Sequence, residues 1–180
     1  MTAYAAGDRE AFREIVARYG PPLLRAMLRH LPAQHEAHDL VQQTFLQLHR
    51  SRNDFDGGQR LRPWVYTIAL NLKREYFRTR KRRPTTSLEE ASLPEPSAGA
   101  PEAERRDTAR HVRAAVGALP PDQREVIELH WFDGLSFPEI GSVLGITTNA
   151  AKVRAHRGYC RLREALLGEL GPGNRSGPGA

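Results

Sequence analysis

Apolar residues recur at helical spacing through the first half of the chain, and the pattern predicts four helices. The predicted helices cover residues 8–19, 21–31, 36–50 and 61–83. Asp8 is a suitable N-cap for the first helix, and Gly20 is expected to end it. Pro21 and Pro22 are expected to open the second helix, because proline is tolerated in the first turn. No stretch shows the two-residue alternation of a β-strand, so this half of the chain predicts an all-α domain.

A second set of helical patterns follows residue 101. These predict helices over residues 102–118, from Asp122 through Trp131, over residues 137–144, and from about Asn149 to about Leu167. The third of them carries an S-x-x-E capping box at Ser136 and Glu139 and ends at Gly145. Thr147, Thr148 or Asn149 caps the last helix. A short helix, a tight glycine-containing turn and a longer basic helix together predict a helix-turn-helix.

Composition separates the two sets of helices. Residues 84–101 hold four prolines and no periodicity, which is typical of a flexible linker, and the Gly/Pro-rich end of the chain predicts disorder. The predicted fold is therefore all-α, with two small helical domains joined by a flexible linker, the C-terminal one a helix-turn-helix. The predicted limits are residues 1–83 for the first domain, 84–101 for the linker, 102–168 for the second domain and 169–180 for the disordered tail.

Charge indicates the class of partner. The chain has 180 residues, is 39% hydrophobic and carries a formal net charge of +6, and residues 1–83 hold 16 Lys and Arg against 8 Asp and Glu. Such a concentration of positive charge favours a polyanionic partner, nucleic acid before membrane. One cysteine, Cys160, leaves no intrachain disulfide, and no stretch approaches the ~20 apolar residues of a membrane span. We therefore expect a cytoplasmic protein with no membrane insertion.

The fourth predicted helix combines a core face with a cationic end. Trp64, Ile68, Leu72 and Tyr76 recur every four residues and are expected to line a core. Seven basic residues lie between positions 73 and 83, with Tyr76 and Phe77 among them. Cations neutralise phosphates and aromatic rings stack on unpaired bases, so this helix suits nucleic acid whose strands have partly separated.

The last predicted helix is basic in a different way. Five basic residues and no acidic residue lie between Asn149 and Arg163. Arg and Lys suit guanine edges and phosphates, and a Thr or Asn near the helix start can bond a base or a phosphate. The candidate duplex-binding residues are Thr148, Asn149, Lys152, Arg154, His156, Arg157 and Arg161. Gly158, in the middle of this helix, permits either close packing or a bend.

Three segments, taken together and in order, resemble a known family. They are DLVQQTFLQLHR (39–50), WVYTIALNLKREYFRTRKRR (64–83) and the stretch from Leu119 to Glu164 that contains FPEIGSVLGITTNAAKVRAHRG. They resemble the two conserved regions of extracytoplasmic-function (ECF) sigma factors, which are two-domain members of the sigma-70 family of bacterial RNA polymerase sigma factors.

The resemblance implies a role for each segment. The implied contacts with core RNA polymerase are Asp39, Gln42, Gln43, Phe45 and Leu46. The residues implied to melt and read the downstream (−10) promoter element are Asn71, Lys73, Arg74, Tyr76, Phe77, Arg78, Arg80 and Lys81. The helix from Asn149 to Arg161 is implied to read the upstream (−35) element as duplex DNA. The resemblance also implies an anti-sigma factor as a partner, no cofactor, and no catalytic residue of the chain's own.

The match departs from the usual family pattern at several positions. Gln43 stands where an acidic residue is common, and Thr67, Leu70 and Tyr159 stand where arginine is frequent.

Three other functions compete with this interpretation. A sigma-like decoy would bind an anti-sigma factor without binding DNA, and would have no need of the basic residues 73–83. A metalloenzyme would use His35, Glu36, His38 and Asp39, but their spacing is not that of a common metal motif. A regulator that binds only duplex DNA would leave the aromatic and basic fourth helix unexplained.

Overall fold

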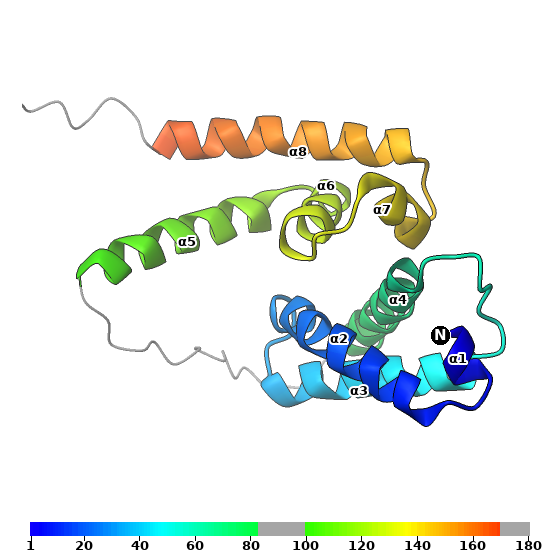
Figure 1. Cartoon of the computed structure of the whole chain (residues 1–180). Helices are drawn as coiled ribbons and strands as arrows, with labels where there is room; N and C mark the ends of the chain where they lie inside the picture. Colours follow the sequence, from blue (N-terminus) through cyan, green and yellow to red (C-terminus); the bar gives the residue numbers. More distant parts are fainter. Residues whose placement is uncertain (83–99, 170–180) are drawn as a thin grey trace, which may run out of the picture. The chain divides into compact units, whose positions relative to one another are not determined.

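The protein folds into two groups of helices, seen in the computed structural model (Figure 1). The structure describes residues 1–82 and 100–169, and the side chains of residues 1–82 and 108–167. The elements are α1 (Thr2–Ala5), α2 (Arg9–Leu28), α3 (Gln34–Arg50), α4 (Leu61–Arg82), α5 (Ala100–Ala118), α6 (Pro121–Ile127), the π-helical turn η1 (Glu128–Phe132), α7 (Phe137–Leu144) and α8 (Thr148–Glu169). No strand occurs in either described range, and the predicted all-α class is confirmed.

The predicted linker and tail lie almost wholly outside the described residues. The exceptions are Ala100 and Pro101, which already belong to α5, and Glu169, which ends α8. Within the described ranges, no helix combines the length and the apolar character that crossing a bilayer requires.

In the first group, α2, α3 and α4 pack against one another and α1 packs on α2. The Asp8 carboxylate caps α2, because its Oδ1 accepts hydrogen bonds from the backbone N–H groups of Glu10 (2.9 Å) and Ala11 (3.2 Å), as predicted. The largest fully buried side chains of this group, each less than 2% exposed, are Tyr66, Leu23, Met27, Leu48, Val65 and Thr44.

The prediction that Gly20 separates two helices is wrong, because α2 runs without interruption from Arg9 to Leu28 with Pro21 and Pro22 inside it. An interior proline costs about 3 kcal/mol, since it removes a backbone hydrogen bond and crowds the preceding turn. Leu23 and Met27, at 0% and 1% exposed, lie on the same helix beyond the prolines. Each such side chain stabilises the fold by about 1.5–3 kcal/mol when buried, and the two together offset at least half of the cost of the two prolines.

The predicted core line of α4 is also misplaced. Trp64, Ile68, Leu72 and Tyr76 are half-buried, whereas the buried residues of the helix include Val65, Tyr66, Ala69 and Leu70. A spacing of four residues advances by about 40° per step around a helix of 3.6 residues per turn. The predicted line therefore winds off the core face, and α4 instead buries a broad face against both α2 and α3.

In the second group, α8 packs along α6 and α5. Val116, Leu119 and Ile127 form a buried cluster against which Val112, Tyr159 and Leu162 pack. Gly158 of α8 lies against Ile127 of this cluster. A Cβ at Gly158 would stand 3.1 Å from Ile127 Cγ1 and 3.2 Å from Ile127 Cδ1. A side chain at this position would have to displace Ile127 by a few tenths of an ångström, so glycine favours the close approach of α8 to α6.

Gly158→Leu is expected to lower the free energy of unfolding by about 1–3 kcal/mol, because the side chain overfills the contact with Ile127. Gly117→Leu is the matched control, since Gly117 is also helical but a Cβ added there would have nothing within 4 Å. Urea denaturation of both variants measures the difference. Equal stability of the two variants would contradict the packing role of Gly158.

The chain between α6 and α8 is shaped by backbone bonds that the sequence pattern does not show. The predicted helix through Trp131 ends as α6 at Ile127 and continues as the wider turn η1. There the Asp133 N–H bonds the Glu128 carbonyl at 3.1 Å, and Trp131 is left 67% exposed. The wider turn shifts the residues of η1 relative to an α-helical register.

The turn between α7 and α8 is close to that predicted. Gly145 has φ +65°, and the Ile146 N–H bonds the Gly141 carbonyl at 2.9 Å, as in a Schellman cap. Of the three candidate N-caps for α8, Thr147 is the one the structure selects. Its Oγ1 accepts a hydrogen bond from the Ala150 N–H at 3.1 Å.

Candidate nucleic-acid interface

The outer side of α4 carries an aromatic ring among cations. Phe77 is 40% exposed, and its ring meets the Tyr76 ring edge-on, with centroids 5.2 Å apart. Of the predicted −10 residues, those exposed with it are Asn71, Arg74, Arg78 and Lys81. This face therefore offers both an apolar ring for stacking and positive charge for phosphates.

The other predicted −10 residues of α4, which are half-buried, are Lys73, Tyr76 and Arg80. Of these, Tyr76 and Arg80 are engaged with Glu36 of α3. Arg80 Nη1 donates to Glu36 Oε1 of α3 at 2.9 Å and to Tyr76 Oη at 2.5 Å. Burial raises the pKa of the Tyr76 hydroxyl, and the Glu36 carboxylate raises it further while Arg80 lowers it. Tyr76 is thus a neutral hydroxyl at physiological pH.

Positive charge on this face is partly balanced within the helix itself. Arg78 Nη2 lies 3.0 Å from Glu75 Oε1, and both side chains are about two-thirds exposed. Pairs of this kind are worth a few tenths of a kcal/mol in water and leave the arginine able to exchange its partner for a phosphate.

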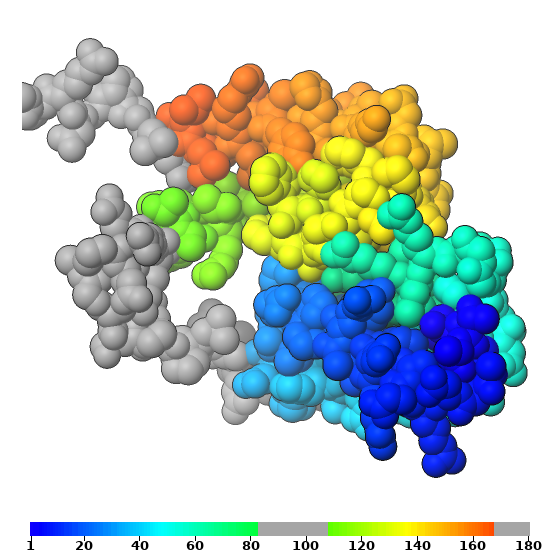
Figure 2. Space-filling view, in the orientation of Figure 1, coloured from blue at the N-terminus to red at the C-terminus, as the bar shows by residue number. Residues whose placement is uncertain are grey.

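The surface of α8, drawn in orange, is visible along its length in Figure 2, and its exposed side carries a row of polar and cationic residues. Ala151, Ala155 and Gly158 are buried and turn inward. The exposed residues on the opposite side are Asn149, Lys152, Val153, His156 and Arg157. They recur at helical spacing and start one residue after the N-terminus of α8. The N-terminal half of α8 can therefore contact base edges in a major groove.

Three predicted −35 residues are half-buried or already engaged with a partner, although Arg161 is exposed. Thr148 is half-buried. Arg154 Nε lies 3.6 Å from Asp122 Oδ2, and Arg161 Nη1 donates to Gln123 Oε1 at 2.6 Å. Both partners belong to α6, so these two arginines help to join α8 to α6.

Sequence reasoning missed Val153, which is 41% exposed between Lys152 and Arg157. An exposed apolar side chain in a groove-reading helix suits the methyl group of thymine. The position was detectable, since Val153 falls between two cations on a helix whose inward residues are small.

The polymerase-binding prediction concerns α3. Asp39, Gln42, Gln43 and Leu46 are exposed, Leu46 at 48%. The prediction that Phe45 contacts polymerase is corrected, because Phe45 is only 8% exposed. Its ring meets that of Phe12 edge-on, with the ring centroids 6.4 Å apart. It supports the α2–α3 contact from within. An apolar groove of about 590 Å³ runs between α2 and α3, and both Phe45 and Leu46 line it.

Three of the residues that depart from the family pattern are hydrogen-bonded or buried in the structure. Thr67 Oγ1 donates to the Pro63 carbonyl at 2.9 Å, and Leu70 is 5% exposed in the core. Tyr159 Oη accepts a hydrogen bond from Trp131 Nε1 at 2.6 Å. Burial raises the pKa of Tyr159, and the bond from Trp131 lowers it.

The candidate metal ligands of the rival enzyme interpretation do not converge. Across the described side chains, no group of three or more His, Cys, Asp and Glu residues is placed to hold a metal ion.

Comparison with known families decides the identity of the two helical groups. Residues 15–83 match the model of Sigma-70 region 2, and residues 110–162 match that of Sigma-70, region 4. The chain belongs to the sigma-70 family. The first match covers α3 and α4, and the second covers the helix-turn-helix.

Individual relatives identify the ECF group within this family. The chain is 38% identical to the RNA polymerase sigma factor CarQ of Myxococcus xanthus, over 94% of this chain and 97% of CarQ. It is 30% identical to the ECF RNA polymerase sigma factor SigW of Bacillus subtilis, over 89% of this chain and 91% of SigW. The structure of CnrH in complex with the cytosolic domain of CnrY matches with a TM-score of 0.69 and 29% identity, over 93% of this chain and 94% of CnrH.

As an ECF sigma factor, the protein binds core RNA polymerase and directs promoter-specific initiation of transcription. Promoter DNA and core polymerase are its partners. The family match thus agrees with the function expected from the aromatic and basic face of α4 and the basic face of α8.

Proposed function

We propose that this sigma factor meets its partners through three separate surfaces. The exposed side of α3, with Asp39, Gln42, Gln43 and Leu46, binds core polymerase. The outer side of α4 stabilises separated strands at the −10 element, and the uncovered side of α8 reads the −35 element as duplex. The proposed domain limits are residues 1–83 and 102–168.

The observation that carries this proposal is the chemical contrast between α4 and α8. On α4 an exposed ring, Phe77, lies beside the exposed cations Arg74 and Arg78. On α8 the exposed row contains cations, the Asn149 amide, the His156 imidazole and Val153, with no Phe, Tyr or Trp between Asn149 and Arg157. Rings are useful where bases have left the stack, whereas cations and amides read the edges of paired bases.

An anti-sigma factor is proposed as a further partner. The support is that CnrH, which is 29% identical to this chain, was solved in complex with the cytosolic domain of CnrY. Basic residues on both DNA-binding helices favour the initiation factor over a decoy that binds an anti-sigma factor and no DNA. We further propose that the protein acts in the cytoplasm, and that polymerase performs the chemistry while this chain supplies recognition and no cofactor.

The proposed function is tested by transcription in vitro from a promoter library. Templates with randomised segments upstream of a fixed transcribed region are incubated with bacterial core polymerase, with and without this chain. Transcripts that depend on the chain should come from templates that share two separate short elements, because each of the two DNA-binding modules selects its own segment of the duplex. If the enriched templates share one element or none, the three-surface assignment fails.

A further inference from the structure

The last turns of α4 are joined to α3 by a chain of hydrogen-bonded polar side chains, Glu36, Arg80 and Tyr76. Arg80 Nη1 bonds Glu36 Oε1 at 2.9 Å and Tyr76 Oη at 2.5 Å, and the Arg80 Cζ atom lies 5.9 Å from the centre of the Tyr76 ring. Glu36 and Arg80 are 44 residues apart, so the contact joins two helices. It differs in this from the exposed pairs Glu10–Arg13 and Glu75–Arg78, each of which stays within one helix.

The end of α4 has little other burial to fix its position. Between positions 77 and 82 every residue except Arg80 is exposed. Unpacked terminal turns of a helix fray, because their last carbonyls lack intrahelical partners and few contacts oppose opening. The Glu36–Arg80–Tyr76 chain therefore decides how firmly the segment carrying Phe77 is held.

The space around the Glu36–Arg80–Tyr76 side chains allows Arg80 to move if the Glu36 carboxylate is lost. A cavity of about 550 Å³ opens beside it, lined among others by Glu36, Leu72, Tyr76, Thr79 and Arg80. Arg80 is thus held by charge and hydrogen bonds rather than by close packing. Its partner is well placed, because Glu36 lies in the first turn of α3, where the helix dipole favours an acid, and Arg80 lies in the last turn of α4, where the dipole favours a cation.

We propose that Glu36 is a positioning residue for strand separation. Its carboxylate fixes Arg80, Arg80 fixes Tyr76, and the Phe77 ring packed edge-on against Tyr76 is thereby presented to the unpaired −10 strand. Glu36 itself touches neither polymerase nor DNA in this role. The inference rests on the proposed use of α4 at separated strands.

The test uses holoenzyme assembled from the full chain and core polymerase, and promoter elements taken from the library selection. One probe is a single-stranded oligonucleotide carrying the non-template −10 element, and the other is duplex DNA carrying the −35 element. Glu36→Gln, which keeps the shape of the side chain and removes its charge, should weaken single-strand binding by about 3- to 10-fold, the loss expected of one partly exposed charged contact. Binding to the duplex probe and to core polymerase should change by less than about twofold.

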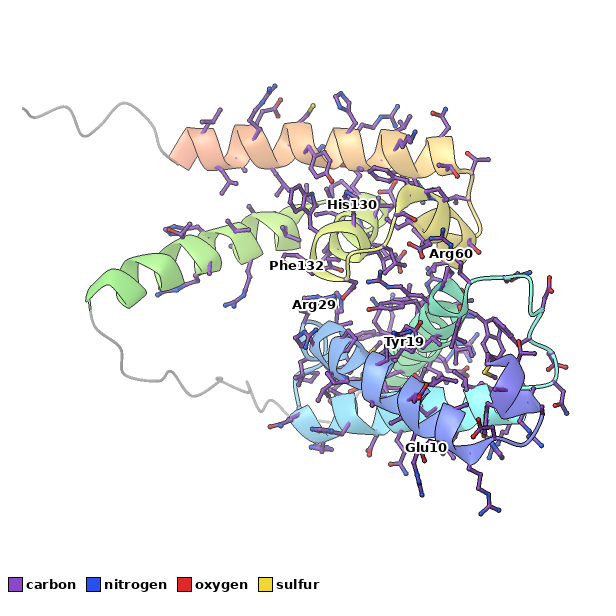
Figure 3. The ribbon with its side chains drawn as sticks, viewed as in Figure 1. Glu10, Tyr19, Arg29, Arg60, His130 and Phe132 are labelled. Carbon is purple, nitrogen blue, oxygen red and sulfur yellow. The ribbon has the colours of Figure 1, made fainter. Side chains whose placement is uncertain are left out.

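The matched control is Glu10→Gln, on α2 (Figure 3). It makes the same change of charge and removes an ion pair of similar length, 2.7 Å, with Arg13. Single-strand binding by this variant should match that of the parent within about twofold, because the pair lies within one exposed helix turn.

A coupling measurement separates positioning from a general structural role. If Glu36 acts through Arg80, Glu36→Gln should have no further effect in an Arg80→Gln background. Tyr76→Phe removes the hydroxyl that Arg80 bonds but keeps the ring, and it should weaken single-strand binding in the same direction. This variant also gives the answer if Glu36→Gln fails to fold.

Three results would overturn the proposal. Loss of polymerase binding by Glu36→Gln would make Glu36 a polymerase contact, and an undiminished effect in the Arg80→Gln background would show that it does not act through Arg80. If Glu36→Gln binds the single strand as tightly as the parent does, the Glu36–Arg80–Tyr76 bonds do not position Phe77. Where Glu36→Gln does not fold, parental binding by Tyr76→Phe would show the same. Failure of the proposed function is distinct, because the parent holoenzyme would then show no affinity for the single strand.

Discussion

Phe77→Ala should reduce formation of the strand-separated promoter complex by about 5- to 150-fold, since stacking of one base on an aromatic side chain is worth about 1–3 kcal/mol. Phe77 is 40% exposed, so its loss removes little core packing. Permanganate reactivity of unpaired thymines near the start site measures strand separation, and gel retardation on the same template at low temperature measures the closed complex. The closed complex should be retained.

Phe77→Trp is the matched control for this substitution, because it changes the side chain but keeps an aromatic face. This variant should retain the strand separation of the parent. A loss of the same size in closed and open complexes would contradict the assignment and would indicate that Phe77 contributes to folding or to polymerase binding. Tyr76→Ala is less informative, since Tyr76 is half-buried and bonded to Arg80.

Arg157→Ala should weaken recognition of the upstream element by about 5- to 150-fold, because a good contact from arginine to a base edge is worth about 1–3 kcal/mol. Arg157 lies on the exposed row of α8. Competition binding of holoenzyme to −35 duplexes of matched and altered sequence measures both affinity and discrimination. Discrimination should fall with affinity if the contact is to a base, and a uniform loss would indicate a phosphate contact instead.

Arg154→Ala is expected to have a smaller effect on the same assay, because Arg154 faces Asp122 of α6 at 3.6 Å. Arg13→Ala controls for the loss of one positive charge, since Arg13 is exposed and pairs with Glu10 on α2. A larger loss for Arg154→Ala than for Arg157→Ala would mean that the groove-reading side of α8 has been misassigned.

The sequence predicted most of the fold because local signals agreed with one another. Asp8 and Thr147 cap helices, and Gly145 ends α7 with a positive φ. These features depend on a few neighbouring residues, so a pattern of caps and stops reveals them. The continuity of α2 could not be predicted in this way, because the burial of Leu23 and Met27 that helps to offset the cost of Pro21 and Pro22 depends on α3 and α4.

The candidate site was predictable in its composition but not in its geometry. The residue types on α4 and α8 indicated which helices meet DNA, but not which of their cations are already engaged. Arg80 reaches Glu36, and Arg161 reaches Gln123. These partners lie 44 and 38 residues away, so periodicity within one helix carries no information about them. Phe45 was assigned to the polymerase contacts from the family resemblance, which carries no information about its burial against Phe12 of α2.

Site-specific photocrosslinking in the promoter complex tests the central claim most directly. A photoreactive phenylalanine analogue is placed at Phe77 in one protein and at Val153, which is 41% exposed, in another. The probe at position 153 should label the upstream element at low and at permissive temperature alike, whereas the probe at position 77 should label the downstream element only after the strands separate. Labelling of one and the same DNA segment from both positions, or equal labelling from position 77 while the duplex is closed, would contradict the account.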